Sequence, residues 1–185
     1  MTTIVPLEIK HFEQAVALGN LVHGDNYLDL AKLTAMQKKA LKNGINANFV
    51  AIEDEHVIGL RLSYAASNWP LDKWCTTSKW PCAQADMAYF KCIAISPEHQ
   101  GKGIGPQLLT ASINALKSQG AKAGIAHLWM QSPGNGAVKY FTKAGGVMIN
   151  EHKNRWLDDC INDGYICTIC GNRCSCSAAE MALVF

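Results

Sequence analysis

The chain has 185 residues, of which 49% are hydrophobic and 17% charged, and its formal net charge is +2. This length and composition predict one domain with a sizeable core, spanning residues 1–185, and exclude long disordered segments. The small net charge, without a stripe of basic residues, argues against a nucleic-acid or a membrane partner.

The expected chemical state of the cysteines depends on the compartment. The first residues carry no leader pattern and no stretch of about 18 apolar residues occurs, so we expect a cytoplasmic protein. In a reducing compartment the eight cysteines are expected to be thiols or metal ligands rather than disulfides.

The first half of the chain predicts two helices and a hairpin. Residues 2–7 predict a short strand, and residues 11–22 an amphipathic helix whose apolar residues recur with helical spacing. A second helix is predicted at residues 29–43, with Gly44 as its C-terminal stop. Two β-rich runs within residues 47–65, separated by an acidic turn, predict an antiparallel hairpin.

The second half predicts alternating strands and helices after a long loop. Residues 67–87 contain three tryptophans, two prolines and two cysteines without periodicity, and we interpret them as a functional loop. The elements predicted after it are, in order, a strand at 88–96, a helix that starts at the glycines 101–105, a strand at 123–131, a helix at 136–145, and strands at 146–151 and 179–185.

The strand at 88–96 enters its helix through the sequence "QGKGIG". The first turn of a helix leaves backbone N–H groups unpaired, and glycines let an anion approach them. The G-x-x-x-x-G-K-[ST] pattern of P-loops is absent, and the spacing of these glycines does not fit the G-x-G-x-x-G pattern of dinucleotide sites. Gln100, Gly103 and Gly105 instead form Q-x-x-G-x-G, which resembles motif A of the GCN5-related N-acetyltransferases (GNAT).

A second stretch, "GNGAVKYFTKAGG" at residues 134–146, resembles the other signature of that family, a helix with small residues and an aromatic that ends in glycine before a strand. The order of elements also agrees, so the resemblance covers about residues 3–150 and the last strand. It implies an α/β (α+β) GNAT fold, with a mixed, mostly antiparallel sheet of six or seven strands flanked by about four helices. Residues 152–178 are then a cysteine-rich insertion between the last two strands.

The resemblance implies acetyl-CoA as co-substrate. Its pyrophosphate is expected on the backbone amides of the glycine turn, and its pantetheine arm is expected to lie as a pseudo-strand in a cleft between the strands at 88–96 and 123–131. Backbone groups of Ile93 and Ile95 are expected to pair with the amides of the arm, and a backbone amide at this level is expected to polarise the thioester carbonyl as it becomes an oxyanion. The residues implied in binding are Ile93, Ile95, Gln100, Gly101, Lys102, Gly103, Ile104, Gly105 and Asn135.

Two places depart from the family pattern at the cofactor. Pro106 has no N–H to donate, although it is tolerated in the first turn of a helix. Gly134 stands where relatives often carry a CoA-contacting asparagine, and Asn135 is its neighbour.

The implied reaction is direct attack of an amine on the acetyl carbonyl, without an acyl-enzyme. Many relatives take the ammonium proton with a glutamate on the motif A strand, and that position is Tyr89 here. Asp86 is the nearest acidic residue, and Glu53, Glu55 or ordered water are alternatives that stay open.

The group that protonates the departing thiolate is a tyrosine in many relatives. Aligning Ala137 and Gly145 with the family pattern puts Phe141 at that place, and Phe141 has no proton to give. Tyr140 is its neighbour, about 100° around the helix, and a shift of one residue would bring it to the sulfur.

The insertion contains four cysteines with the spacing C-x2-C-G-x2-C-x-C: Cys167, Cys170, Cys174 and Cys176. Four thiolates are a ligand set for structural zinc, and Cys160 or His152 are alternative ligands. A loop of free thiols is the main competing interpretation. In the family this connection, the one between the first two helices and the long loop at 67–87 surround the acceptor entrance.

The leading function is therefore an N-acetyltransferase that uses acetyl-CoA and an amine acceptor, either a small molecule or a peptide. A zinc-stabilised CoA-binding or sensing module with weak or no catalysis is the alternative. A zinc protein that binds nucleic acid is disfavoured by the low charge near the cysteines. The identity of the acceptor amine stays open. A homodimer is possible, because members of the family often dimerise.

Overall fold

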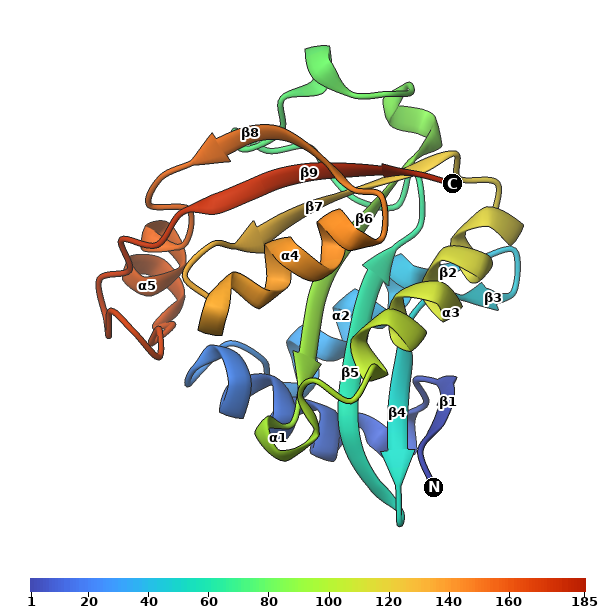
Figure 1. Cartoon of the computed structure of the whole chain (residues 1–185), viewed down its shortest axis with the longest axis vertical. Helices are drawn as coiled ribbons and strands as arrows, with labels where there is room; N and C mark the ends of the chain where they lie inside the picture. Colours follow the sequence, from blue (N-terminus) through green and yellow to red (C-terminus); the bar gives the residue numbers. More distant parts are fainter.

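A computed structural model describes all residues, 1–185. Its centre is a seven-stranded sheet in the order β1-β4-β5-β6-β7-β9-β8 (Figure 1). Strands β6 and β7 are parallel and every other neighbouring pair is antiparallel, so the predicted mixed sheet is confirmed. The bounds are β1 Thr3–Pro6, β4 Phe49–Glu53, β5 His56–Tyr64, β6 Met87–Ile95, β7 Ala123–Trp129, β8 Val147–His152 and β9 Ala178–Val184.

Helices cover both faces of the sheet (Figure 1). Helices α1 (Phe12–His23) and α2 (Leu30–Ala40) pack on one face, where they share a buried cluster with side chains of β5. Helices α3 (Ile104–Ser118) and α4 (Gly136–Lys143) pack on the other, against Phe90 and the β7 and β9 side chains of that face. No helix combines the length and the apolar character that a membrane span needs.

The second helix is shorter than predicted. Helix α2 ends at Ala40, and the chain continues into a small hairpin of β2 (Leu41–Lys42) and β3 (Ile45–Asn46). Asn43 and Gly44 form its two-residue turn with φ angles of 54° and 74°. The prediction that Gly44 ends the helix was wrong, because an Asn-Gly pair with both φ angles positive is the turn that closes a tight hairpin.

The cysteine-rich insertion lies between β8 and β9, as predicted. It is more ordered than a plain loop, because it contains a fifth helix, α5 (Leu157–Asp163). The count of about four helices therefore holds for the sheet faces, and the fifth belongs to the insertion. The long loop before β6 holds two short 3-10 turns, at Thr77–Lys79 and Gln84–Asp86.

Strands β6 and β7 separate halfway along their length. Met87–Phe90 pair with Ala123–Ala126, and no pairing follows beyond Phe90. A β-bulge lies at the same level, because Leu62 pairs with Cys92 whereas Ser63 pairs with Phe90, leaving Lys91 as the extra residue. The rest of β6, as far as Ile95, therefore leaves β7 and opens a gap in the sheet (Figure 1).

The packing of Phe90, the last residue of β6 that pairs with β7, depends on a glycine of β7 and can be tested there. A Cβ at Gly124 would overlap the ring of Phe90, whereas a Cβ at Gly136 would meet nothing within 4 Å. We predict that Gly124→Ala lowers the free energy of unfolding by about 1–3 kcal/mol through overpacking. Gly136→Ala is the control, with unchanged or slightly raised stability. Urea denaturation of the two variants and the wild type gives the comparison, and equal stability of all three would contradict the packing described.

Candidate functional site

The glycine turn joins β6 to α3. After a 3-10 turn at Pro97–His99, Gly101 and Gly103 adopt left-handed φ angles of 76° and 78°, and α3 begins directly afterwards. The Gln100 side chain donates a hydrogen bond of 3.2 Å to the Ile95 carbonyl and braces the turn. A Cβ at Gly101, Gly103 or Gly105 would meet nothing within 4 Å, so the space around the helix start is open. This geometry suits an anion on the first amides of α3.

The free edge of β6 presents backbone groups to the gap. Ser96 N–H donates to the Ile58 carbonyl on β5, and because strand residues alternate, the backbone groups of Ile93 and Ile95 face away from β5. The Ile93 carbonyl lies 3.0 Å from Nε2 of His23 in α1. Burial is the main cause that lowers the pKa of His23 to about 4, so this imidazole is neutral near pH 7. The two carbonyls on the edge expected to pair with the pantetheine arm are thus already in contact with His23 and Gln100.

Helix α4 brings one aromatic to the core and another to the gap. Phe141 is fully buried and packs edge-on against Phe90, with ring centroids 5.6 Å apart. The Tyr140 hydroxyl accepts a hydrogen bond of 2.8 Å from Nη1 of Arg61 on β5. Burial raises the pKa of Tyr140, while the charge and hydrogen bond of Arg61 oppose that rise. Asn135 precedes the helix, and its buried Oδ1 has no hydrogen-bond partner.

Tyr89 lies on the opposite face of the sheet, one residue before Phe90. Its hydroxyl is 2.9 Å from Nδ1 of His127, whose Nε2 is 2.7 Å from the Trp74 carbonyl. A carbonyl only accepts, so Nε2 carries the proton, Nδ1 is the acceptor and Tyr89 donates to it. Burial lowers the pKa of His127 to about 4, which keeps this tautomer neutral. Burial raises the pKa of Tyr89, and the charge and hydrogen bond of the neighbouring Arg155 oppose that rise.

A buried carboxylate lies beyond His127 on β9. Glu180 is fully buried and accepts four hydrogen bonds, from the Thr76 N–H and hydroxyl, the Trp80 indole and His152. Burial alone would raise the pKa of Glu180, but these hydrogen bonds outweigh it and lower the pKa. His127, His152 and Glu180 have ligand atoms within 4.8 Å of one another, yet Glu180 is already saturated. The hydrogen bonds of Glu180 with Thr76 and Trp80 hold the long loop against the sheet.

Comparisons with known proteins identify this arrangement. The profile described as "Acetyltransferase (GNAT) family" matches residues 22–146, which is more than half of the chain. The chain belongs to the GNAT acetyltransferase family. No curated sequence matches it significantly.

Solved structures share the GNAT fold at low identity. The ribosomal-protein-S18-alanine N-acetyltransferase of Escherichia coli is 17% identical with a TM-score of 0.69, covering 100% of this chain and 94% of its own. The yncA protein of Salmonella typhimurium, solved with its cofactor acetyl-CoA, is 16% identical with a TM-score of 0.67 and the same coverage. Arabidopsis thaliana Naa50, in complex with the bisubstrate analogue CoA-Ac-MVNAL, is 17% identical with a TM-score of 0.65, covering 100% and 99%.

The carboxylates considered as bases in this GNAT chain have other positions. Asp86 lies just before β6, at the end of the strand where β6 and β7 are still paired, and forms an ion pair of 2.7 Å with Lys122. Glu53 accepts from Thr2 and lies 3.2 Å from His99. Glu55 is exposed in the β4–β5 turn. The structure therefore brings Tyr89 and Tyr140 to the level where the strands part, but not Asp86.

The three segments expected around the acceptor entrance of a GNAT enzyme lie together. In the insertion, Ile166 N–H donates to the Asp25 carbonyl, and the Tyr165 hydroxyl donates 2.7 Å to the His23 carbonyl. The long loop joins the same wall through a 2.6 Å ion pair between Lys73 and Asp158. Residues far apart in the sequence therefore form one wall on the α1 and α2 side of the gap.

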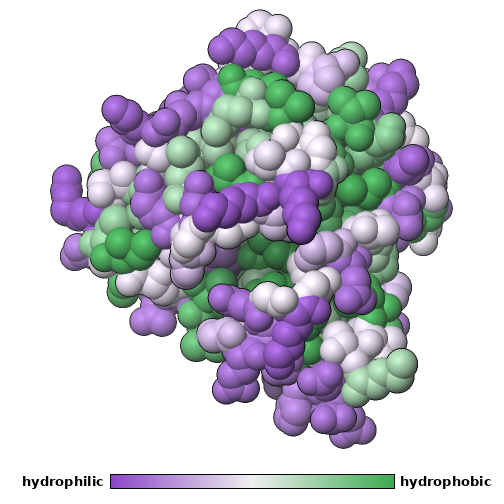
Figure 2. All heavy atoms as spheres, viewed as in Figure 1, coloured by the Kyte–Doolittle hydropathy of each residue, from purple (hydrophilic) through white to green (hydrophobic).

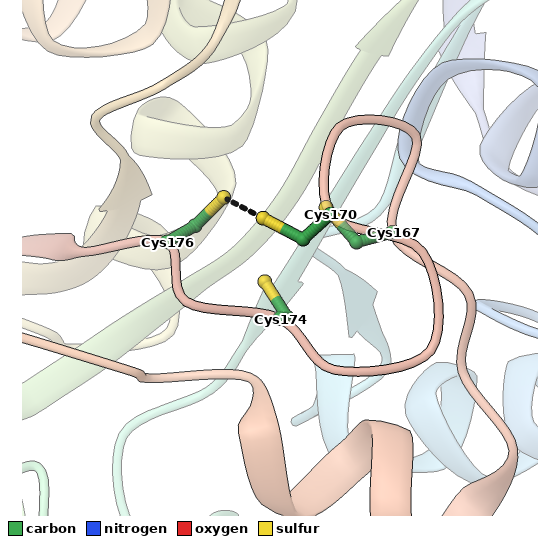
Figure 3. A group of neighbouring side chains, drawn as sticks. All are labelled: Cys167, Cys170, Cys174 and Cys176. Carbon is green, nitrogen blue, oxygen red and sulfur yellow. Dashed lines mark hydrogen bonds between the residues drawn. The ribbon is translucent and has the colours of Figure 1, made fainter.

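The four predicted cysteines converge in this wall (Figure 3). Their sulfurs all lie within 4.8 Å of one another, and those of Cys170 and Cys176 are 3.5 Å apart. Cys167 and Gly171 exchange two backbone hydrogen bonds of 2.9 Å, and Ile169 N–H points at the Cys167 sulfur. The alternative ligands lie apart from this set: Cys160 is near the Gly171 carbonyl and His152 is bound to Glu180.

Three polar residues of the site were not predicted from the sequence. Arg61, His127 and Glu180 all lie inside apolar strands, in the runs "GLRLSY", "AHLW" and "AAEMAL". A polar or charged residue at an inward position of a buried strand is the signal that identifies them, because such groups are rarely buried without a partner.

Proposed function

We propose that this GNAT acetyltransferase, acting as one domain over residues 1–185, moves the acetyl group of acetyl-CoA to an amine by direct attack in a ternary complex. The observation that carries the proposal is the opening between β6 and β7 beside the glycine turn. Figure 2 shows a hollow with a hydrophobic floor on the α3 and α4 face, between α4 and the start of α3. A hollow of this kind suits the apolar pantetheine arm.

Residues of the turn would hold the cofactor. The backbone amides from Gln100 to Gly105 would bind the pyrophosphate, with Lys102 adding charge, and the open space at both left-handed glycines fits phosphate oxygens. The Ile93 and Ile95 backbone would pair with the arm. Asn135 has a buried acceptor without a partner and lies at the start of α4, so an N–H group of the arm would complete it.

Tyr89 and Tyr140 lie on opposite faces of the sheet at the level where β6 and β7 separate. Tyr140 lies on the α4 side, where its hydroxyl would protonate the departing thiolate. Tyr89 lies on the α1 and α2 side, where its hydroxyl oxygen would accept a hydrogen bond from the attacking nitrogen, and the proton of that nitrogen would pass to water. No step requires a carboxylate base.

The wall of the acceptor side carries acidic and basic side chains. Asp158 is paired with Lys73, and Asp72 and Asp159 with Arg155, whereas Asp25 is exposed and forms no ion pair. The neighbours solved with a peptide bisubstrate analogue or named for a ribosomal alanine support an α-amine on a peptide, and a small amine remains the alternative.

A zinc-stabilised CoA-binding module with weak catalysis is the second candidate. Phe141 at the expected acid position is in the core, and Glu180, the carboxylate beyond His127, already accepts four hydrogen bonds. Weak turnover with tight cofactor binding would favour this candidate.

We also infer that Cys167, Cys170, Cys174 and Cys176 bind a structural zinc ion. A Zn–S distance of about 2.3 Å places tetrahedral sulfurs about 3.8 Å apart, close to the separations found here. The ion would stabilise the insertion and has no step in the reaction.

Cofactor binding can be tested with a matched pair of glycine variants. Gly103 and Gly120 both have positive φ angles and open space at Cβ, but Gly120 follows the C-terminal end of α3. Gly103→Ala should weaken acetyl-CoA binding at least tenfold, because its methyl group stands between the amides and the phosphate; Gly120→Ala should not. Isothermal titration measures both, and a wild type that binds neither acetyl-CoA nor CoA would refute the proposed activity.

The chemical role proposed for Tyr89 can be tested separately from its contribution to packing. Tyr64 stacks on Tyr89 and its hydroxyl makes no hydrogen bond, so Tyr64→Phe is the control. Tyr89→Phe should reduce kcat/KM for the amine by about 10- to 100-fold, the effect of a lost hydrogen bond to a charged group, and leave KM for acetyl-CoA unchanged. Thiol release with a panel of amines and peptides gives these constants. Equal losses in both variants would assign Tyr89 to packing alone.

The zinc ion is testable by elemental analysis. Protein purified without added metal should hold about one zinc per chain, and Cys174→Ser should lower both the zinc content and the melting temperature. Cys82→Ser is the control, because that cysteine lies in the long loop outside the cluster. Less than about a tenth of an equivalent in the wild type would show that these thiols do not bind zinc in the protein.

A further inference from the structure

Arg61 is a buried cation without an acidic partner. Its side chain is 1% exposed in the middle of β5, and it forms no ion pair. Nη1 donates to the Tyr140 hydroxyl, and the guanidinium carbon lies 4.5 Å from the centre of the Phe90 ring. Nε and Nη2 are buried and have no hydrogen-bond partner. Two donors of a charged group are thus left unsatisfied in the interior, which is strongly unfavourable.

The position of this guanidinium indicates what would satisfy it. The side chain starts on β5, crosses β6 over Phe90 and ends at Tyr140 of α4. Phe90 is the last residue of β6 that pairs with β7. The guanidinium therefore lies at the point where the gap begins, on the α3 and α4 face. Under the proposed function, on which this step rests, the thioester end of the pantetheine arm would lie at that point.

We propose that Arg61 is a catalytic residue that binds the sulfur of the leaving group and stabilises the coenzyme A thiolate. Nε and Nη2 have no partner in the protein, so they are the donors that would bind the sulfur, and a guanidinium keeps its charge at every working pH. A fixed cation in a buried site stabilises developing negative charge without reorganisation, and that charge appears only as the carbon–sulfur bond breaks.

The same contact orients Tyr140. Since Nη1 donates to the Tyr140 oxygen, the hydroxyl proton of Tyr140 is not used in this contact and would be donated to the sulfur. The amine nitrogen forms the new bond to the acetyl carbon and releases its proton to water near Tyr89. The carbon–sulfur electron pair goes to sulfur, which takes the Tyr140 proton. The phenolate that remains is hydrogen-bonded to Arg61 and recovers a proton from solvent.

Few other titratable groups face this guanidinium. Tyr140 comes from α4 and Cys92 from β6, on its far face, while α3 contributes the neutral Ser112 near Ser63. The acidity of a thiol bound there thus reports chiefly on Arg61.

The direct test is the acidity of CoA bound to the enzyme. The thiolate absorbs in the ultraviolet, so a pH titration of the complex gives the thiol pKa, which we expect at least one unit below that of free CoA. Arg61→Gln should bring it back to the value in solution, whereas Arg173→Gln, which removes an exposed arginine of the insertion, should not. A wild-type complex whose thiol is no more acidic than free CoA overturns the inference, even if the variant does not fold.

Kinetics separate this role from a structural one. Arg61→Gln should lower kcat by about 100- to 1000-fold with little change in KM for acetyl-CoA, and Arg61→Lys should recover part of the loss. A lower melting temperature with unchanged kcat per binding-competent site would overturn the catalytic role. Failure of the wild type to bind CoA would instead refute the proposed function. Binding and turnover with an unshifted thiol would refute the role of Arg61 alone.

Discussion

The structure depends on one local event, the loss of pairing between β6 and β7 after Phe90. Adjacent parallel strands normally continue to pair, because each unpaired backbone group in the interior is costly. Here the bulge at Lys91 twists β6 away, and contacts from His23 and Gln100 satisfy carbonyls at the freed edge. The gap is therefore stable without a bound arm, and an arm that paired with these carbonyls would have to replace His23 and Gln100.

The alternation of side chains along β6 divides the chemistry between two faces. Tyr89 and Phe90 are neighbours in sequence, yet Tyr89 packs with Trp69 on one face and Phe90 with Phe141 on the other. At the level where the strands part, one face thus offers a hydroxyl oriented by a neutral histidine, and the other a guanidinium and a hydroxyl. An amine and a thioester that approach from opposite faces meet different chemistry within one level of the sheet.

The sequence predicts those features that short-range patterns encode. The glycine turn at Gly101 and Gly103, the β4–β5 hairpin and the place of the insertion were all predictable, since spacing and turn residues determine them. The hairpin at Asn43 and Gly44 was misread because helical spacing continued through residues that prefer a tight turn. Arg61 and Tyr140 were beyond reach as a pair, since 79 residues separate them and only the sheet places β5 under α4. Tyr140 itself was considered, but its orientation depends on Phe141 filling the core next to Phe90.

The insertion determines how the acceptor side is built. A segment of about 25 residues with one short helix buries little apolar surface by itself, so its shape depends on its contacts within the cysteine cluster and with the rest of the chain. The four cysteines form a compact cluster with Tyr165, and Tyr165 and Ile166 then hydrogen-bond to the start of the α1–α2 connection. A Cβ at Gly24 would overlap the Ile166 carbonyl, so the two segments touch at backbone level. Order at the cysteine centre is therefore transmitted to His23 and to the Ile93 edge through direct hydrogen bonds.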